Sequence, residues 1–237
     1  MADFLLIHGS CHGAWCWRDV LHGLRAAGHD ARAIDLPGHG DDATPVGAVT
    51  LDAYAEAILN AIDGPVTLVG HSMAGFPISR VAEIAPERVA RLIYLCAYLP
   101  VPGKSLAQMR REGPSQPLME AVITAPDGQS FTIDPQLAES RFYQDCPPGT
   151  TEFAVPRLCP QPVAPQATPI TLGDAWAGVE KYYIRCTDDR TIPPEYQVTM
   201  SAGLPPANVS ALPTGHSPFF AAPAMLVARL IEIAETE

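Results

Sequence analysis

The sequence has few basic residues and no cluster of them. Its 237 residues contain 15 Lys and Arg against 26 Asp and Glu, which gives a formal net charge of −11. Proteins that bind nucleic acid neutralise its phosphates with grouped Lys and Arg side chains. The missing basic cluster therefore argues against nucleic acid as a partner.

A long hydrophobic run is also missing. The first apolar stretch, residues 4–7, follows the sequence MAD with no basic residue before it, and it is far too short for a signal peptide or a membrane span. We therefore expect no membrane as a partner and a cytoplasmic location.

Cysteine pairs of the Cys-x-x-Cys type are absent. The six cysteines are scattered along the chain, at Cys11, Cys16, Cys96, Cys146, Cys159 and Cys186. Thiols spread in this way stay reduced in a reducing compartment. We expect free cysteines, with the close pair Cys11 and Cys16 serving as packing residues.

What is present is an alternation of apolar runs with helical patterns. Six short runs bounded by Gly, Pro or Asp predict buried strands, at 4–7, 31–34, 66–69, 92–96, 182–186 and 209–212. Between them, 15–27, 51–62, 74–85 and 225–234 have apolar residues at helical spacing. The chain, 47% hydrophobic, therefore predicts one α/β domain with a mostly parallel sheet of about six strands flanked by helices.

One stretch interrupts this alternation. Residues 100–169 hold 13 of the 25 prolines and have no clean strand periodicity. Seventy residues are too many for a loop in a compact domain, so they predict an inserted cap with short helices. The candidate helices are 105–111 and 135–143.

The sequence GHSMAG, residues 70–75, lies where a predicted strand passes into a helix. A serine between small residues at such a turn is typical of a nucleophile elbow, in which strand and helix approach closely. Ala74 stands at the second glycine of the usual G-x-S-x-G pattern, with Gly75 behind it. The alternative is that Ser72 only caps the helix.

A serine nucleophile needs a base, and the base needs an acid that orients it. His216 follows the last predicted strand, and the sequence CTDDRTIP follows the strand before it. The chain order is then Ser72, an aspartate, His216, each at the carboxyl end of a strand. The D-x-x-I-P form favours Asp189 over Asp188 as the acid.

The first strand is followed by the sequence HGSCHG, residues 8–13. This turn predicts an oxyanion hole formed by the backbone N–H groups of Ser10 and Met73. His8 and His12 have the spacing of a helical metal pair, but Gly9 and the strand exit argue against a helix, so we expect no metal. His39 and His71 are interpreted as structural residues.

Six motifs, HGSCHGAWCW, DLPGHG, GHSMAG, LCAYLP, CTDDRTIPPEYQ and GHSPFFAAP, together resemble the plant methylesterase and hydroxynitrile lyase branch of the α/β-hydrolases. That branch includes a salicylate-binding methylesterase and polyneuridine aldehyde esterase. The resemblance covers residues 4 to about 235. It implies an α/β-hydrolase core of residues 1–98 and 179–237, a helical cap of residues 99–178 and no cofactor, and it leaves a homodimer open because such enzymes frequently dimerise.

Lyases of this branch have a lysine directly after the catalytic histidine and a glutamate directly before the serine. These positions hold Ser217 and His71 here. With no cation beside the base, departing cyanide would have little stabilisation. The resemblance therefore favours a serine carboxylesterase acting on a small-molecule ester, with a hydroxynitrile lyase-like enzyme as the alternative.

The ester itself is less well defined by the sequence. Apolar residues of the cap and of the segment after the base predict a pocket for small hydrophobic acyl groups, with methyl esters as one candidate class. These residues are Leu118, Met119, Phe131, Phe142, Tyr143 and Phe219. Two further readings stay open, a small-molecule binder with little turnover and an enzyme acting on a single complex methyl ester.

Overall fold

A six-stranded parallel sheet forms the centre of the protein. The computed structural model describes residues 1–236. The strand order is β2-β1-β3-β4-β8-β9, and every neighbouring pair is parallel. The strands are β1 (Asp3–Ile7), β2 (Asp30–Ile34), β3 (Val66–His71), β4 (Val89–Leu95), β8 (Lys181–Cys186) and β9 (Val209–Leu212). The predicted sheet of about six strands is therefore confirmed.

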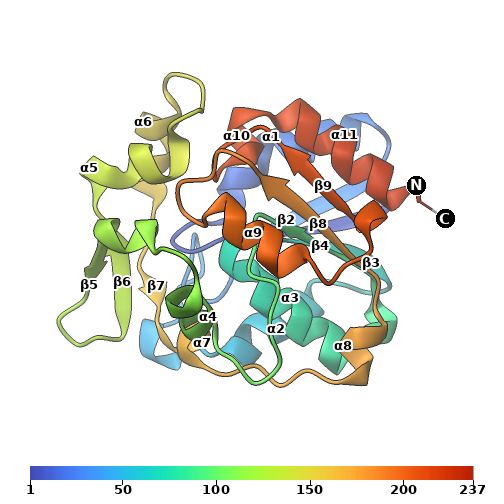
Figure 1. Ribbon diagram of the computed structural model, residues 1–237, viewed down its shortest axis with the longest axis horizontal. Helices are drawn as coiled ribbons and strands as arrows, with labels where there is room; N and C mark the ends of the chain where they lie inside the picture. Colours follow the sequence, from blue (N-terminus) through green and yellow to red (C-terminus); the bar gives the residue numbers. More distant parts are fainter. Residues whose placement is uncertain (237) are drawn as a thin grey trace.

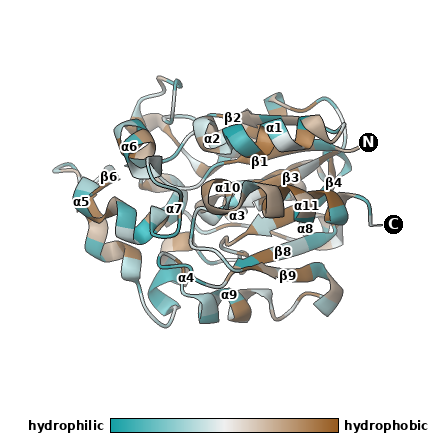
Figure 2. Cartoon of the chain, turned by 90° about the horizontal axis from the view of Figure 1, so that it is seen from above, coloured by the Kyte–Doolittle hydropathy of each residue, from teal (hydrophilic) through white to brown (hydrophobic). Residues whose placement is uncertain are grey.

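Helices cover both faces of this sheet (Figures 1 and 2). Successive side chains of a strand point to opposite faces, so a strand buried on both faces is apolar throughout. In β1, Phe4 and Leu6 pack in one apolar cluster with α1 and α11, whereas Leu5 and Ile7 pack in the other with α2 and α3. The bounds of these helices are α1 (Arg18–Ala26), α11 (Pro223–Ala234), α2 (Leu51–Asn60) and α3 (Gly75–Ile84). All four predicted helices are present.

Most of the chain between β4 and β8 lies at one end of the sheet, away from the termini, whereas its last helix, Asp174–Gly178, packs against α3 (Figure 1). Its helices are α4 (Leu106–Glu112), α5 (Pro135–Ala138), α6 (Thr150–Ala154), α7 (Ala164–Ala167) and α8 (Asp174–Gly178). The predicted helix 105–111 corresponds to α4. The predicted helix 135–143 is α5 followed by a π-helix, Glu139–Tyr143.

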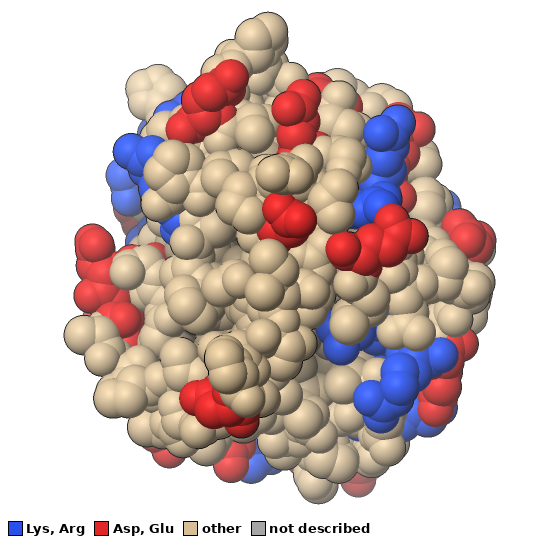
Figure 3. Space-filling model, turned by 90° about the vertical axis from the view of Figure 1, so that its left-hand side faces the viewer, with Lys and Arg blue, Asp and Glu red and all other residues tan. Residues whose placement is uncertain are grey.

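This segment also contains a small antiparallel sheet that the sequence did not predict. Its strands are β5 (Val122–Thr124), β6 (Ser130–Ile133) and β7 (Gln161–Pro162). Strands of two to four residues are too short to show an apolar period. Figure 3 views the molecule from the side of this segment, where uncharged residues cover most of the surface and acidic side chains are scattered.

The remaining elements are short. Two helices follow β8 and β9, namely α9 (Pro194–Ser201) and α10 (Pro218–Ala221). The 3-10 turns are η1 (Ala14–Trp17), η2 (Val46–Ala48), η3 (Ser72–Ala74), η4 (Pro86–Arg88), η5 (Pro117–Ala121), η7 (Val155–Arg157) and η8 (Pro206–Asn208). Within residues 1–236, no helix has the length and apolar character needed to cross a membrane. All six cysteines lie in this described part and are free thiols.

Candidate active site

Ser72 lies in the sharp turn between β3 and α3. Its backbone φ of 56° is in the left-handed region, which a residue with a side chain rarely adopts and which costs free energy. The N-cap residue of α3 is Ala74, and neither η3 nor α3 has a side-chain cap bond in the described chain. The side chain of Ser72 therefore does not cap the helix, and the turn has the backbone form expected of a nucleophile elbow.

Two glycines allow the turn to form. A Cβ on Gly70 would lie 2.8 Å from the carbonyl oxygen of Ala74, and a Cβ on Gly75 would overlap the carbonyl oxygen of Tyr98. Ala74, at the usual second glycine of the motif, is fully buried without such a conflict. The close approach therefore requires glycine at 75 rather than at 74.

His216 and Asp189 form a buried pair beyond the ends of β9 and β8. His216 Nδ1 lies 2.8 Å from Asp189 Oδ2, and both side chains are almost inaccessible to solvent. A carboxylate only accepts hydrogen bonds, so Nδ1 carries the proton and Nε2 is left as an acceptor. Asp188 is exposed. Of the two candidate acids, only Asp189 is therefore brought to His216.

Asp189 is held by a dense set of donors. Its Oδ1 accepts from the backbone N–H groups of Thr191 and Ile192 at 2.7 and 2.9 Å, and its Oδ2 also accepts from Gln197 Nε2 at 2.9 Å. Gln197 Oε1 in turn accepts from the backbone N–H of Cys186 at 2.9 Å. No sequence pattern singles out Gln197, although it lies only eight residues after Asp189, on the helix that follows β8.

His71 is hydrogen-bonded to the backbone of His216, the candidate base. Its Nε2 donates to the carbonyl oxygen of His216 at 2.7 Å, and the two rings are 4.6 Å apart. Burial, with the neighbouring His216 and His12, lowers the pKa of His71 well below its usual range. The neutral imidazole then has an unpartnered Nδ1. His71 is structural, as expected, but it also positions a candidate catalytic residue.

The predicted oxyanion donors lie on two segments that meet near Ser72. Met73 is the second residue of the 3-10 turn, where backbone N–H groups have no partner within the helix. The Ser10 turn is anchored by His12, whose Nδ1 donates to the carbonyl oxygen of Ser10 at 2.8 Å. Tyr143 donates its hydroxyl proton to His12 Nε2, also at 2.8 Å.

Gln166, on α7 of the inserted segment, contacts both residues that are predicted to donate to the oxyanion, Ser10 and Met73. Its Nε2 donates to Ser10 Oγ at 2.9 Å and lies 3.7 Å from Met73 Sδ. Its side chain is buried, at 4% exposed. No signal in the sequence pairs residues 156 positions apart, so this contact could be found only in the structure.

A cavity of about 230 Å³ opens beside Gln166 within the inserted segment. Of the six predicted pocket residues, Met119 and Phe131 line it. The other four, Leu118, Phe142, Tyr143 and Phe219, are buried in the apolar core. Among them, the Phe142 ring stacks on His216 with centroids 5.8 Å apart, so part of this core borders the candidate base.

His8 and His39 have structural partners. His8 Nε2 accepts from the backbone N–H of Leu36 at 3.1 Å, and His39 Nε2 lies 3.1 Å from Gln161 Oε1. In residues 1–236, the potential metal ligands that cluster are His71, Cys96 and His216, within 4.8 Å of one another. Burial raises the pKa of the Cys96 thiol well above its usual range, so it stays protonated and binds metal poorly.

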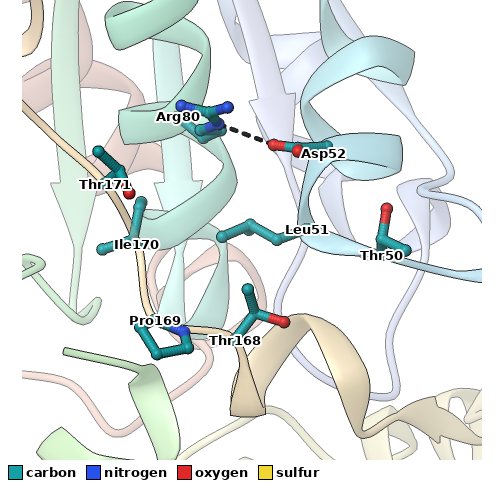
Figure 4. A pocket seen from close by; sticks show the side chains of 8 residues that line it. All are labelled: Thr50, Leu51, Asp52, Arg80, Thr168, Pro169, Ile170 and Thr171. Carbon is teal, nitrogen blue, oxygen red and sulfur yellow. Dashed lines mark hydrogen bonds and ion pairs between the residues drawn. The ribbon is translucent and has the colours of Figure 1, made fainter. Parts of the chain in front are cut away.

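A second hollow, of about 270 Å³, lies between α2, α3 and the chain after α7 (Figure 4). Its charged groups are Asp52 and Arg80, which pair with each other at 2.7 Å. Because these two charges pair with each other and the lining includes no histidine, this hollow has no counterpart of the Asp189–His216 pair.

A strained serine after a central strand and a buried Asp–His pair at the same edge of a parallel sheet are features of the serine hydrolase class. Comparison with known sequences is in agreement: residues 4–230 match the model of the alpha/beta hydrolase family. The chain belongs to this family, and it is a carboxylic ester hydrolase.

Two curated relatives are similar over nearly their whole length. Methylesterase 7 from Arabidopsis thaliana is 30% identical, with 98% of this chain and 96% of the relative covered. Esterase PIR7B from Oryza sativa subsp. japonica is also 30% identical, with 98% and 95% covered.

Among solved structures, a pyrethroid hydrolase from Sphingobium faniae JZ-2 has a TM-score of 0.87 at 26% identity and covers 99% of this chain and 98% of its own. Polyneuridine aldehyde esterase, at 24% identity and a TM-score of 0.87 over 99% of both chains, shares the fold.

Proposed function

We propose that the protein is a serine carboxylesterase that hydrolyses small, mostly apolar esters through an acyl-enzyme. The observation that carries this proposal is the 2.8 Å contact between His216 Nδ1 and Asp189 Oδ2, at the edge of the sheet where Ser72 adopts its left-handed conformation. Nucleophile, base and acid then take the order Ser72, His216, Asp189.

In the acylation step, Ser72 Oγ attacks the ester carbonyl carbon while His216 Nε2 takes the hydroxyl proton. Asp189 stabilises the imidazolium that results. The backbone N–H groups of Ser10 and Met73 donate to the oxyanion, and His216 gives its proton to the departing alkoxide, which leaves as the alcohol.

In the deacylation step, His216 removes a proton from water, and the hydroxide attacks the acyl carbon. The tetrahedral intermediate collapses, Ser72 regains its proton from His216, and the carboxylic acid leaves. Each proton taken by His216 is returned within the same half-reaction, so the mechanism requires no metal or cofactor.

We assign residues 99–178 the role of a cap over this site. The hydrogen bond from Gln166 to Ser10 Oγ supports the assignment, because it joins the inserted segment to a predicted oxyanion residue, and the cavity lies beside Gln166. The apolar lining residues, such as Met119, Val122 and Phe131, suit an apolar acyl group. The names of the relatives, which include methyl jasmonate esterase 1 from Vitis vinifera, make methyl esters the first class to assay.

A lyase reaction is less well supported. The residue after the candidate base is Ser217, and the two lysines of the chain are engaged elsewhere. Lys104 pairs with Glu112, and Lys181 Nζ donates to backbone carbonyl oxygens, including that of Val179 at 2.7 Å. A cyanide leaving group would have no ammonium beside the base to stabilise it.

The first test is the release of p-nitrophenol from p-nitrophenyl acetate and butyrate. We expect turnover by the wild-type protein and its loss in Ser72→Ala. Ser140→Ala is the matched control, because Ser140 lies in the π-helix and donates to the carbonyl oxygen of Leu137, within the inserted segment. A fluorophosphonate probe followed by peptide mass spectrometry is expected to label Ser72.

Equal turnover in wild type and Ser72→Ala would overturn the mechanism. Tight ligand binding without any product from a panel of methyl esters would instead support a small-molecule binder, and cyanide release from a cyanohydrin would support the lyase. Size-exclusion chromatography with light scattering tests the predicted homodimer separately.

A further inference from the structure

A positively charged side chain lines the cavity beside Gln166. Arg110 and Ala107 are three residues apart on α4 and face the cavity together. The rest of the lining is mainly apolar, with Thr124 and Gln166 as the other polar side chains. A cavity that bound only apolar groups would not need a guanidinium in its lining, so the presence of Arg110 requires a separate explanation.

Arg110 has no counter-charge in the described part of the chain. No ion pair within residues 1–236 includes it, and its Nε is buried without a hydrogen-bond partner. Burial lowers the pKa of the guanidinium, but an arginine keeps its charge in proteins. Arg110 as a whole is half-buried, so an acceptor in the cavity would give its buried Nε the partner that buried donors nearly always have.

Two residues connect Arg110 with the candidate catalytic serine. Gln166 lines the same cavity and donates to Ser10 Oγ, so one side of the cavity borders the candidate oxyanion hole. Tyr98 donates its backbone N–H to the carbonyl oxygen of Ser72 at 3.0 Å. Burial raises the pKa of Tyr98, and the nearby charge of Arg110 partly opposes that rise. Gln166, which shares the cavity with Arg110, therefore links this cavity to the Ser72 region.

We propose that Arg110 binds a carboxylate at the far end of the substrate's acyl group, so that preferred substrates are half-esters of dicarboxylic acids. This inference rests on the proposed esterase function and names its substrate class. The planar guanidinium donates two parallel hydrogen bonds to a carboxylate, and the apolar lining surrounds the methylene chain between the two ends. The cavity, of about 230 Å³, has room for a short acyl chain.

The overall charge of the protein makes this local contact necessary. The net charge of −11 repels an anionic substrate at long range. At physiological salt, exposed charges are screened beyond about 8 Å, whereas a half-buried guanidinium such as that of Arg110 is screened less at short range. Selection for a carboxylate therefore depends on Arg110 itself and not on a general attraction to the surface.

The test compares two substrates of equal length, monomethyl adipate and methyl hexanoate. We expect the wild-type kcat/KM to be at least about 10-fold higher for monomethyl adipate, because a hydrogen-bonded charge pair contributes that much selectivity or more. The ratio of the two kcat/KM values is expected to fall about 10- to 100-fold in Arg110→Met and by less in Arg110→Lys, which keeps the charge but loses the planar fork. Arg111→Met, at the exposed next position, keeps the wild-type ratio.

A wild-type ratio near one, or an equal fall of both kcat/KM values in Arg110→Met and Arg110→Lys, overturns the inference while leaving the esterase function intact. Binding separates the two claims. Calorimetry with the Ser72→Ala protein measures the affinity for monomethyl adipate with and without the Arg110→Met change. If monomethyl adipate binds only when Arg110 is present, the carboxylate site is supported. If the wild-type protein also hydrolyses neither ester, the proposed function is contradicted. Binding that is equal with and without Arg110 contradicts the carboxylate site.

Discussion

His71 Nε2 donates a 2.7 Å hydrogen bond to the carbonyl oxygen of His216, so the residue before the candidate nucleophile holds the backbone of the candidate base. Both residues are buried, and their rings are in contact. The turn that strains Ser72 is therefore also bonded to the backbone of His216, and we expect a change at His71 to alter the geometry of the candidate site.

Replacing His71 tests this coupling. His71→Phe leaves the buried carbonyl oxygen of His216 with only the weak Cys96 thiol donor, at 3.7 Å, which costs about 1–3 kcal/mol of stability. We expect kcat to fall at least about 10-fold with KM nearly unchanged, because the base is displaced and not the pocket. His71→Gln, which keeps a donor, is expected to recover part of kcat. Lost stability with an unchanged kcat in both variants would show that His71 only fills space.

The two neighbouring aspartates make a matched pair of variants. Asp189→Asn puts an amide where four donors converge on a carboxylate, so His216 loses the acceptor that orients it. We expect kcat to fall about 10³- to 10⁴-fold in steady-state assays. Asp188→Asn, at an exposed position, is expected to change kcat less than about twofold. The reverse order of effects would assign the acid to Asp188.

Gly75 is expected to tolerate no side chain. In Gly75→Ala the new Cβ overlaps the carbonyl oxygen of Tyr98, and overpacking of this kind costs about 1–3 kcal/mol or more. Gly178→Ala is the control, because a Cβ there meets nothing within 4 Å. Urea denaturation of both variants measures the difference, and equal stabilities would mean that the turn relaxes without cost.

Stability is expected to decrease on acidification because of buried neutral histidines. Burial lowers the pKa of His12 to about 4, below its usual value of about 6.5. Between these two values the unfolded chain binds a proton at this site that the folded chain does not bind. The free energy of unfolding therefore falls as pH drops from about 6.5 to about 4, by up to about 1.4 kcal/mol per pH unit for this residue.

The variant His12→Gln checks this origin. Urea denaturation between pH 4 and pH 8 is expected to give a slope against pH that is smaller by up to one proton than in the wild type, and the difference vanishes above about pH 7. Tyr143→Phe removes the donor to His12 Nε2 without removing the imidazole, so it retains most of the slope. An unchanged slope in His12→Gln would assign the acid sensitivity to other groups.

Much of the fold was predictable because its signals are local. Apolar runs such as Leu5 to Ile7 and the amphipathic helices between them depend on residues a few positions apart, which the sequence displays directly. The small antiparallel sheet was missed because Gln161 and Pro162 have no strand character by themselves. They pair with β6 because the fold places them beside it.

The candidate site was predictable to the same extent. Ser72 and its turn are encoded by small neighbours, and Asp189 and His216 follow strands that end at the same edge of the sheet. The lining of the pocket was not predictable from the sequence. An apolar residue in the inserted segment, such as Phe142 or Met119, can equally well lie in a core or line a cavity. Hydrophobicity drives burial without specifying what covers the side chain.

By itself, the sequence determined the α/β alternation, the strained turn at Ser72 and the order of serine, acid and histidine, because each depends on backbone preferences and short spacing. Only the tertiary structure decided that His71 holds His216, that Gln166 reaches Ser10, and that Arg110 lines a cavity without a counter-charge. These contacts join residues tens to more than a hundred positions apart. Their existence depends on how whole layers pack, which no local pattern of residues records.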